Sequence, residues 1–208
     1  SMSGAAGTSH PVRCIGIRCR VGIRSSCERQ SHVDQDFSQR LPFGTYEDAL
    51  RMVGARSEPR TAATAVSAAR IQLFAAMVRD GNRSYWDHEF ARRQWGGLLA
   101  PPALLMGWLI APPWQPGGGR SASLIALRVP LPGTTFINAA NEVEFPQPIV
   151  EGDVLTVVDE LVSVSPEKRT RLGVGHFIET LQTYRRQDGA VVATSRNTLF
   201  RFTPGRSS

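Results

Sequence analysis

The chain has 208 residues, of which 41% are hydrophobic and 20% are charged, and its formal net charge is +6. This composition excludes a wholly disordered chain, and the length suits one domain with a sizeable core. The longest apolar stretch, Leu98 to Pro113, is interrupted by prolines and a glycine and is too short to cross a bilayer. We therefore expect a cytoplasmic protein without a membrane span.

Arginine supplies almost all of the positive charge, since Lys168 is the single lysine. A basic protein can bind nucleic acid, but these arginines are scattered and no aromatic–basic recognition module accompanies them. We expect no nucleic-acid role. The arginine-rich, lysine-poor composition favours a bacterial origin with a GC-rich genome.

Residues 1–42 combine glycine, serine, arginine and cysteine without a sustained period, which predicts a flexible basic tail before a domain at residues 43–208. The three cysteines, Cys14, Cys19 and Cys27, all lie in this tail. Their spacings match no common zinc pattern, and their odd number disfavours a disulfide framework. We expect free thiols in a reducing compartment and no metal site.

Helical signals dominate the first half of the predicted domain. Thr45 is a good N-cap for a short helix that ends near Gly54, and the stretch Thr61 to Val66 favours an edge strand. Ser67 begins an amphipathic helix with apolar residues at helical spacing. A polar turn follows, and then a short helix from His88 to Gln94.

The segment Ala103–Ile110 is apolar on nearly every face, and Pro101 and Pro102 suit its first turn, so we expect a helix buried all round. Five predicted strands follow, separated by polar turns: Ser123–Val129, Phe136–Phe145, Val154–Val164, Thr170–Arg186 and Ala190–Phe202. Helices followed by an antiparallel meander indicate an α+β fold in which the apolar helix lies on the sheet.

Four motifs, in this order, carry a resemblance to a known family: RDGNRSYWDHEFA, GGLLAPPALL, EFPQPIVEGDVL and RLGVGHFIETLQTYRRQDGAVVATSRNTLF. From Tyr46 to Pro204 the chain resembles MaoC-like acyl dehydratases and (R)-specific enoyl-CoA hydratases, above all their FAS1-like N-terminal dehydratase domains. The resemblance implies a hotdog fold, an antiparallel sheet wrapped around a long apolar central helix. The tryptophan-rich pattern is also similar to subunits of bacterial steroid side-chain degradation, which implies lipid or steroid acyl-CoA metabolism.

The resemblance also implies a catalytic turn with an aspartate, an asparagine two residues later and a histidine three further on. Asp80 and Asn82 occupy the first two places, and Tyr85 occupies that of the histidine. Histidine has a pKa of about 6.5 and tyrosine one near 10, so Tyr85 is a poor general base at neutral pH. His88 is the nearest histidine and an alternative base, and Asp80 and Asn82 also suit a structural turn.

Substrate contacts are expected around this turn. Asn82 and Trp86 are candidates for substrate binding, and backbone N–H groups near Gly96, Gly97 and Ala103 are candidates for an oxyanion hole. If the four tryptophans line one cavity, they suit a bulky apolar acyl group. Four arginines, Arg169, Arg171, Arg185 and Arg186, are candidates for contacts with coenzyme A phosphates, although solvated strand positions explain them as well.

Three functions remain open at this stage. The first is a subunit of a heteromeric enoyl-CoA hydratase, in which a second hotdog chain supplies the Asp/His pair. The second is a homodimeric hydratase that uses Asp80 with Tyr85 or His88, and the third is a non-catalytic acyl-thioester-binding protein. All three take an acyl-CoA thioester as ligand, and none requires a metal or redox cofactor.

Overall fold

The computed structural model describes residues 41–110 and 124–205. Contacts between residues divide the chain into two units, Ser1–Gln39 and Arg40–Ser208. The fold described below is that of the unit Arg40–Ser208. Residues 1–40 of the predicted tail, which include the three cysteines, lie outside the described residues, so their properties stay predictions.

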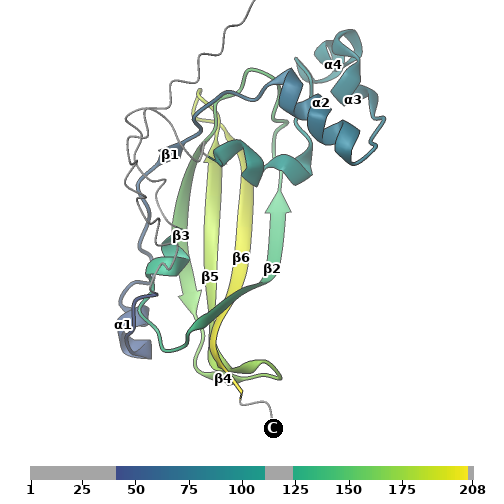
Figure 1. The fold of residues 1–208 in the computed structure, drawn as a ribbon. Helices are drawn as coiled ribbons and strands as arrows, with labels where there is room; N and C mark the ends of the chain where they lie inside the picture. The colour runs from purple at the N-terminus through teal and green to yellow at the C-terminus, as the bar shows by residue number, and fades with distance from the viewer. Residues whose placement is uncertain (1–40, 111–123, 206–208) are drawn as a thin grey trace, which may run out of the picture. The chain divides into compact units, whose positions relative to one another are not determined.

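An antiparallel sheet forms the body of this unit (Figure 1). Its strand order is β1-β3-β5-β6-β2, and β4 pairs with one end of β5. The strands are β1 (Arg60–Thr61), β2 (Thr135–Glu144), β3 (Thr156–Val164), β4 (Lys168–Arg169), β5 (Gly173–Arg185) and β6 (Val191–Pro204). The four long predicted strands after residue 130 are confirmed. The strand predicted at 61–66 is reduced to Arg60–Thr61, and residues 125–128 form a 3₁₀ turn, η3 (Ile125–Arg128), instead of a strand.

Side-chain alternation along β3 and β5 explains why the sheet has a covered face. Val157 and Leu161 on β3 are buried, and so are Ile178 and Tyr184 on β5. Strand side chains alternate between faces, so these residues build one apolar layer. The layer has two parts: one cluster surrounds Trp108, Leu105 and Tyr184, and the other surrounds Ile178, Leu161 and η3.

The helices lie in two groups. Near one end of the sheet are α2 (Ala68–Met77), α3 (Arg83–Trp86) and α4 (His88–Trp95), and α1 (Tyr46–Leu50) lies apart from them (Figure 1). Thr45 caps α1 as predicted, in a reciprocal box with Asp48. Ser67 is the N-cap residue of α2, but its side chain makes no capping hydrogen bond.

The prediction of a long apolar helix over residues 103–110 is wrong. This segment forms two 3₁₀ turns, η1 (Pro102–Leu104) and η2 (Met106–Leu109). Its hydrogen bonds span three residues, as from the Leu104 N–H to the Pro101 carbonyl. Two adjacent prolines remove two donors, and a segment this short has too few residues to repay helix nucleation. It is also not buried all round, because Ile110 is 71% exposed.

None of the helices in the described ranges has the length and apolar character needed to span a membrane.

Asp159 on β3 is a carboxylate buried on the covered face of the sheet, so its protonation tests how strongly that face excludes water. Its Oδ2 accepts the Ile125 N–H at 2.9 Å, and its Oδ1 has no partner within the described part of the chain. Burial raises the pKa of Asp159, so the folded state binds its proton more tightly than the unfolded state. Its contribution to stability is therefore present at low pH and is lost as pH rises through the folded-state pKa.

We expect Asp159→Asn to raise the melting temperature at pH 8 by about 2–4 °C, which is roughly 1 kcal/mol for a domain of this size. Asparagine keeps an acceptor for Ile125 and removes the buried charge. The gain should shrink toward pH 4 in thermal unfolding measured across pH. The control is exposed Asp188, whose pKa a hydrogen bond from Arg186 lowers, so Asp188→Asn should show the opposite pH trend. A loss of stability in Asp159→Asn that grows with pH would contradict this account.

Candidate functional site

The polar turn after α2 is held by its own hydrogen bonds. Arg79 adopts a left-handed conformation (φ 56°), and the Asp80 N–H donates to the Ala75 carbonyl at 2.8 Å. Asp80 Oδ1 accepts the Asn82 N–H at 3.0 Å, and the Asp80 carbonyl accepts the Trp86 indole N–H at 2.8 Å. The Asp80 side chain is thus engaged in shaping the turn.

Asn82 is the N-cap residue of α3. Its side-chain oxygen accepts the Ser84 N–H at 3.0 Å, which satisfies one of the free donors at the helix start. The turn therefore uses both predicted polar residues, Asp80 and Asn82, for local structure.

Tyr85 is buried in the apolar cluster around Trp108. Burial raises the pKa of its hydroxyl, and the negative charge of Asp80 raises that pKa further. A phenol with a raised pKa stays protonated at neutral pH, so it can donate a hydrogen bond but cannot act as the general base. The Tyr85 N–H donates to the Asn82 carbonyl at 2.9 Å, so Tyr85 follows directly on the polar turn.

The described residues contain two histidines, and they lie in different settings. His88 begins α4, is exposed, and has its Nδ1 3.9 Å from the Glu151 carboxylate. His176 is buried on β5, where its Nδ1 lies 3.0 Å from the Ser165 carbonyl and its ring stacks on Tyr46. Residues that hold His176 belong to the other end of the sheet, so its role there is structural.

The segment after α4 pairs with the segment before β3. Gly96 ends α4 in a left-handed conformation (φ 92°), which glycine adopts without steric cost. The Ala100 N–H then donates to the Ile149 carbonyl, and the Glu151 N–H donates to the Leu98 carbonyl, both at 2.8 Å. Gly97 packs against Val150 within this pairing. Gly96 and Gly97 thus position the backbone that leads into the paired segments.

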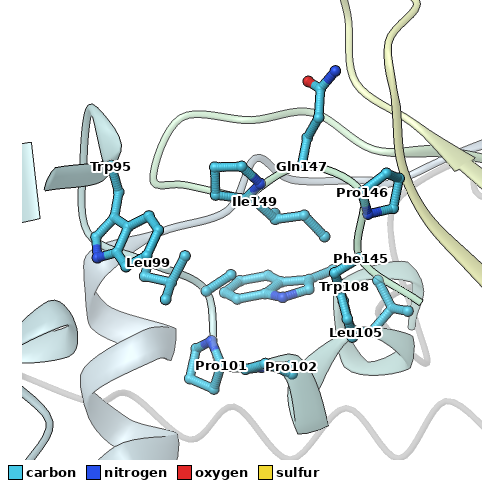
Figure 2. Close-up of a pocket in the computed structure, with 12 residues that line it drawn as sticks. Trp95, Leu99, Pro101, Pro102, Leu105, Trp108, Phe145, Pro146, Gln147 and Ile149 are labelled. Atoms are coloured by element: carbon cyan, nitrogen blue, oxygen red, sulfur yellow. The ribbon is translucent and has the colours of Figure 1, made fainter. Parts of the chain in front are cut away.

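The cleft has a volume of about 260 Å³ and lies between these paired segments (Figure 2). Its lining is almost wholly apolar: Trp95, Leu99, Ala100, Pro101, Pro102, Leu105, Trp108, Phe145, Pro146, Gln147, Pro148 and Ile149. Gln147 is the one polar side chain of this set, and Figure 2 shows it directed away from the space between Trp108 and Ile149. For comparison, an apolar cavity of about 150 Å³ holds benzene, so this cleft suits a larger apolar group.

Of the three tryptophans in the described residues, Trp95 and Trp108 line the cleft. The Trp95 indole N–H donates to the Ser84 hydroxyl at 3.0 Å, which ties the cleft wall to the polar turn. Trp108 is 1% exposed, and the Arg70 guanidinium lies 4.6 Å from its ring centroid. Trp86, a predicted substrate contact, is bonded to the turn and does not line the cleft, and Trp114 lies outside the described residues.

The opposite wall, residues 145–149, is the part that the sequence did not assign to the site. Its motif EFPQPIV contains the proline spacing and the Phe145 and Ile149 side chains that make an apolar wall. The prolines after β2 were the available signal, because they exclude a continuing strand and force an exposed, rigid loop.

The α-helix start at Ala103, on which the expected oxyanion hole depended, is not formed. Ala103 lies exposed in a three-residue 3₁₀ turn and does not line the cleft. A turn of this length has neither the aligned peptide dipoles nor the row of free N–H groups that an α-helix offers.

The four candidate arginines do not form one phosphate site. Arg169 and Arg171 line a groove of about 330 Å³ at the β4 end of β5, whereas Arg185 ends β5. Thirteen strand residues separate the two ends by roughly 40 Å. Arg186 pairs with Asp188 and donates to Gln147 at 3.3 Å, so it lies at the rim of the cleft. Across the described ranges, no group of three or more His, Cys, Asp or Glu residues could hold a metal ion.

Comparison with known proteins identifies the class. A family model described as FAS1-like, dehydratase domain region, matches residues 51–195. The chain belongs to this family of MaoC-like acyl dehydratases and enoyl-CoA hydratases.

A curated relative matches most of the chain. The chain is 35% identical over 170 residues to a protein of Thermomonospora curvata named "Probable enoyl-CoA hydratase alpha subunit"; the match covers 78% of this chain and 53% of that protein. The chain thus spans about half the length of this curated relative.

Two structures share the fold. A chain of the ChsH1-ChsH2 complex from Mycobacterium tuberculosis matches with a TM-score of 0.63 and 23% identity, over 77% of this chain and 93% of that one. The MaoC-like dehydratase from Rhodospirillum rubrum matches with a TM-score of 0.51 and 24% identity, over 74% and 94%. The predicted hotdog class is confirmed, with short 3₁₀ turns where a long helix was expected at residues 103–110.

The bond between Ser84 and Trp95 should be needed for stability of the site. We expect Ser84→Ala to lower the free energy of unfolding by about 1 kcal/mol, because the Trp95 indole loses its acceptor. Urea unfolding followed by tryptophan fluorescence measures this change. Ser67→Ala is the matched control and should cost less, because that hydroxyl makes no capping bond. Equal losses in the two variants would contradict the role of the Ser84 hydroxyl.

Proposed function

We propose that this chain is a subunit of an enoyl-CoA hydratase or 3-hydroxyacyl-thioester dehydratase, in which it holds the acyl group and a partner hotdog subunit supplies the Asp/His pair. The observation that carries the proposal is an apolar cleft tied to a polar turn in which protonated Tyr85 occupies the place of the base. The chain keeps a binding site and lacks the proton acceptor beside it.

The chemistry explains why a second chain is needed. In hydration, the oxygen of water bonds to the β-carbon of the enoyl thioester, one water proton passes to a base, and a proton is delivered to the α-carbon. A group with a pKa near neutral serves both transfers well. Tyr85 has a raised pKa and stays protonated, so the residue at the place of the histidine cannot serve as this group. The reaction itself requires no metal or redox cofactor.

An exposed edge strand supports a hotdog partner. β2 is at the end of the strand order, and its residues from Asn138 onward are exposed on both faces. A long edge strand presents unpaired backbone groups to which another strand can add. Val143 and Phe145 remain partly exposed at the end of β2 that leads into the cleft. The name "alpha subunit" of the curated relative and the two-protein complex among the similar folds agree with such an assembly.

The lining of the cleft supports a bulky apolar acyl group as substrate. Trp95, Trp108 and Phe145 provide wide aromatic walls, which suit the lipid or steroid acyl-CoA thioesters that the sequence resemblance implies.

Hydration assays with the purified chain, alone and mixed with catalytic-type hotdog subunits encoded beside its gene, test the proposal. With medium-chain and steroid-type enoyl-CoA substrates, we expect turnover only in a mixture. Asp80→Asn should change kcat/KM of the active mixture by less than about threefold, since it does not supply the base.

Two other outcomes would overturn the proposal. Turnover by the chain alone that Asp80→Asn or His88→Ala abolishes would establish a self-sufficient hydratase. Saturable acyl-CoA binding without turnover in any mixture would establish a binding protein.

A further inference from the structure

The edge strand β2 carries negative charge that its own sequence does not balance. The strand contains Glu142 and Glu144 and no lysine or arginine, although the whole chain has 24 lysines and arginines against 18 aspartates and glutamates. Both glutamates are exposed, and neither takes part in an ion pair among the described residues. A basic protein thus presents an acidic strand at one border of its sheet (Figure 1).

The two glutamates lie on the outer face of the sheet. Glu142 is paired with Arg196 on β6, and the sequence neighbours of Arg196, Ser195 and Asn197, are buried on the covered face. Residues that lie opposite each other in an antiparallel pair share a face, and so do residues two positions apart. Glu142 and Glu144 are therefore adjacent on the face that lies away from the two apolar clusters.

The cation opposite Glu142 already has another partner. Arg196 donates a hydrogen bond to Glu179 on β5, and this bond is the largest cause of the raised pKa of Arg196. The charges of Glu142 and Glu144 raise that pKa further by smaller effects. Within the described residues, the strand thus keeps surplus negative charge that basic residues across its open edge can offset.

This charge pattern opposes the pairing of β2 with the β2 of a second copy. In an antiparallel self-pair centred on Val143, Glu142 of each copy would lie opposite Glu144 of the other. In a self-pair centred on Asn141, the Glu142 side chains of the two copies would be diagonal neighbours. Like charges that lie opposite each other destabilise a strand pair, and long side chains at diagonal positions are also within reach.

Protection of the edge from aggregation does not explain the strand completely. Charged side chains are a common means of such protection, and they act without a partner. However, Val143 lies between the two glutamates in sequence and is 38% exposed, and Phe145 directly after the strand is 37% exposed. Apolar side chains left at the same edge favour a surface that a specific partner covers.

We propose that Glu142 and Glu144 select the partner of this chain: they pair with lysine or arginine residues at alternate positions on the edge strand of a different hotdog subunit, and they oppose assembly of the chain with itself. The identity of the partner as a hotdog subunit rests on the proposed function. Opposite charges in cross-strand pairs stabilise the joined sheets, and their exposed position makes this recognition sensitive to salt.

The affinity for the hotdog subunit encoded beside the gene of this chain, measured by calorimetry, tests the proposal. Glu142→Lys/Glu144→Lys should weaken binding by at least about tenfold, and Glu142→Gln/Glu144→Gln by about threefold, because the glutamine variant loses attraction without adding repulsion. Glu58→Lys/Glu167→Lys is the matched control: it changes the net charge equally at two exposed glutamates outside β2 and should weaken binding by less than about twofold. The glutamine variant keeps the test valid if the lysine variant folds poorly.

Self-association gives a readout that does not need the partner. Sedimentation velocity would compare the wild-type chain, the Glu142→Lys/Glu144→Lys chain and an equal mixture of the two. We expect the mixed dimer to be favoured over either homodimer by at least about tenfold, because its strands place glutamates against lysines and the homodimers oppose like charges. The preference should fall as salt is raised to about 1 M. Homodimers as abundant as the mixed dimer would overturn the proposal.

The remaining outcomes separate this proposal from the proposed function. If the neighbouring subunit binds and the mixture hydrates enoyl-CoA, but charge reversal leaves the affinity unchanged, the proposed function stands and the role of Glu142 and Glu144 is wrong. If the neighbouring subunit does not bind, the proposed function fails. The mixture of wild-type and charge-reversed chains then decides alone: a favoured mixed dimer supports the role of the two glutamates, and equal or absent association in the three samples overturns it.

Discussion

The backbone pairing of residues 98–100 with residues 149–151 is the interaction on which the site depends. Two hydrogen bonds of 2.8 Å join segments that are about fifty positions apart in the chain, and they set the aromatic wall around Trp95 opposite the proline-rich loop before Ile149. The same segment is attached to the polar turn, since the Leu99 N–H donates to the Ser84 carbonyl at 3.0 Å. The cleft and the turn therefore form one structural unit.

Within this unit, the polar turn is used for local structure. The turn retains Asp80 and Asn82, but their side chains serve backbone geometry, and burial keeps Tyr85 protonated. The cleft beside the turn has aromatic walls, and one of them contains the buried indole N–H of Trp108. These features are the basis of our proposal that the chain is the acyl-binding subunit of an assembly. In that proposal, the exposed edge strand β2 is the surface for the partner subunit.

The sequence predicted those features that local patterns determine. Thr45 caps α1 as predicted, and β5 and β6 lie where the sequence places strands between polar turns. Residues 103–110 were mispredicted because an apolar run does not distinguish an α-helix from tight turns that leave one side in solvent.

The cleft itself could be predicted only in part, because it is made by contacts between distant segments. The motifs of the family resemblance include both walls, but they did not assign residues 145–149 to the site, and the register of Ala100 against Ile149 is not encoded locally. The burial of Tyr85, and with it the direction of its pKa, likewise depends on the cluster that packs around it. The family motif predicts the position of Tyr85 in the turn, but it does not predict which side chains surround Tyr85.

Photolabelling tests most directly the central claim that this cleft receives the acyl group. An acyl-CoA with a diazirine at the far end of its acyl chain would be irradiated with the assembled complex, and labelled peptides mapped by mass spectrometry. The account predicts label on residues 95–108 or 145–149 of this chain. Label found solely on the partner subunit, or in the groove beside Arg169 and Arg171, would contradict it.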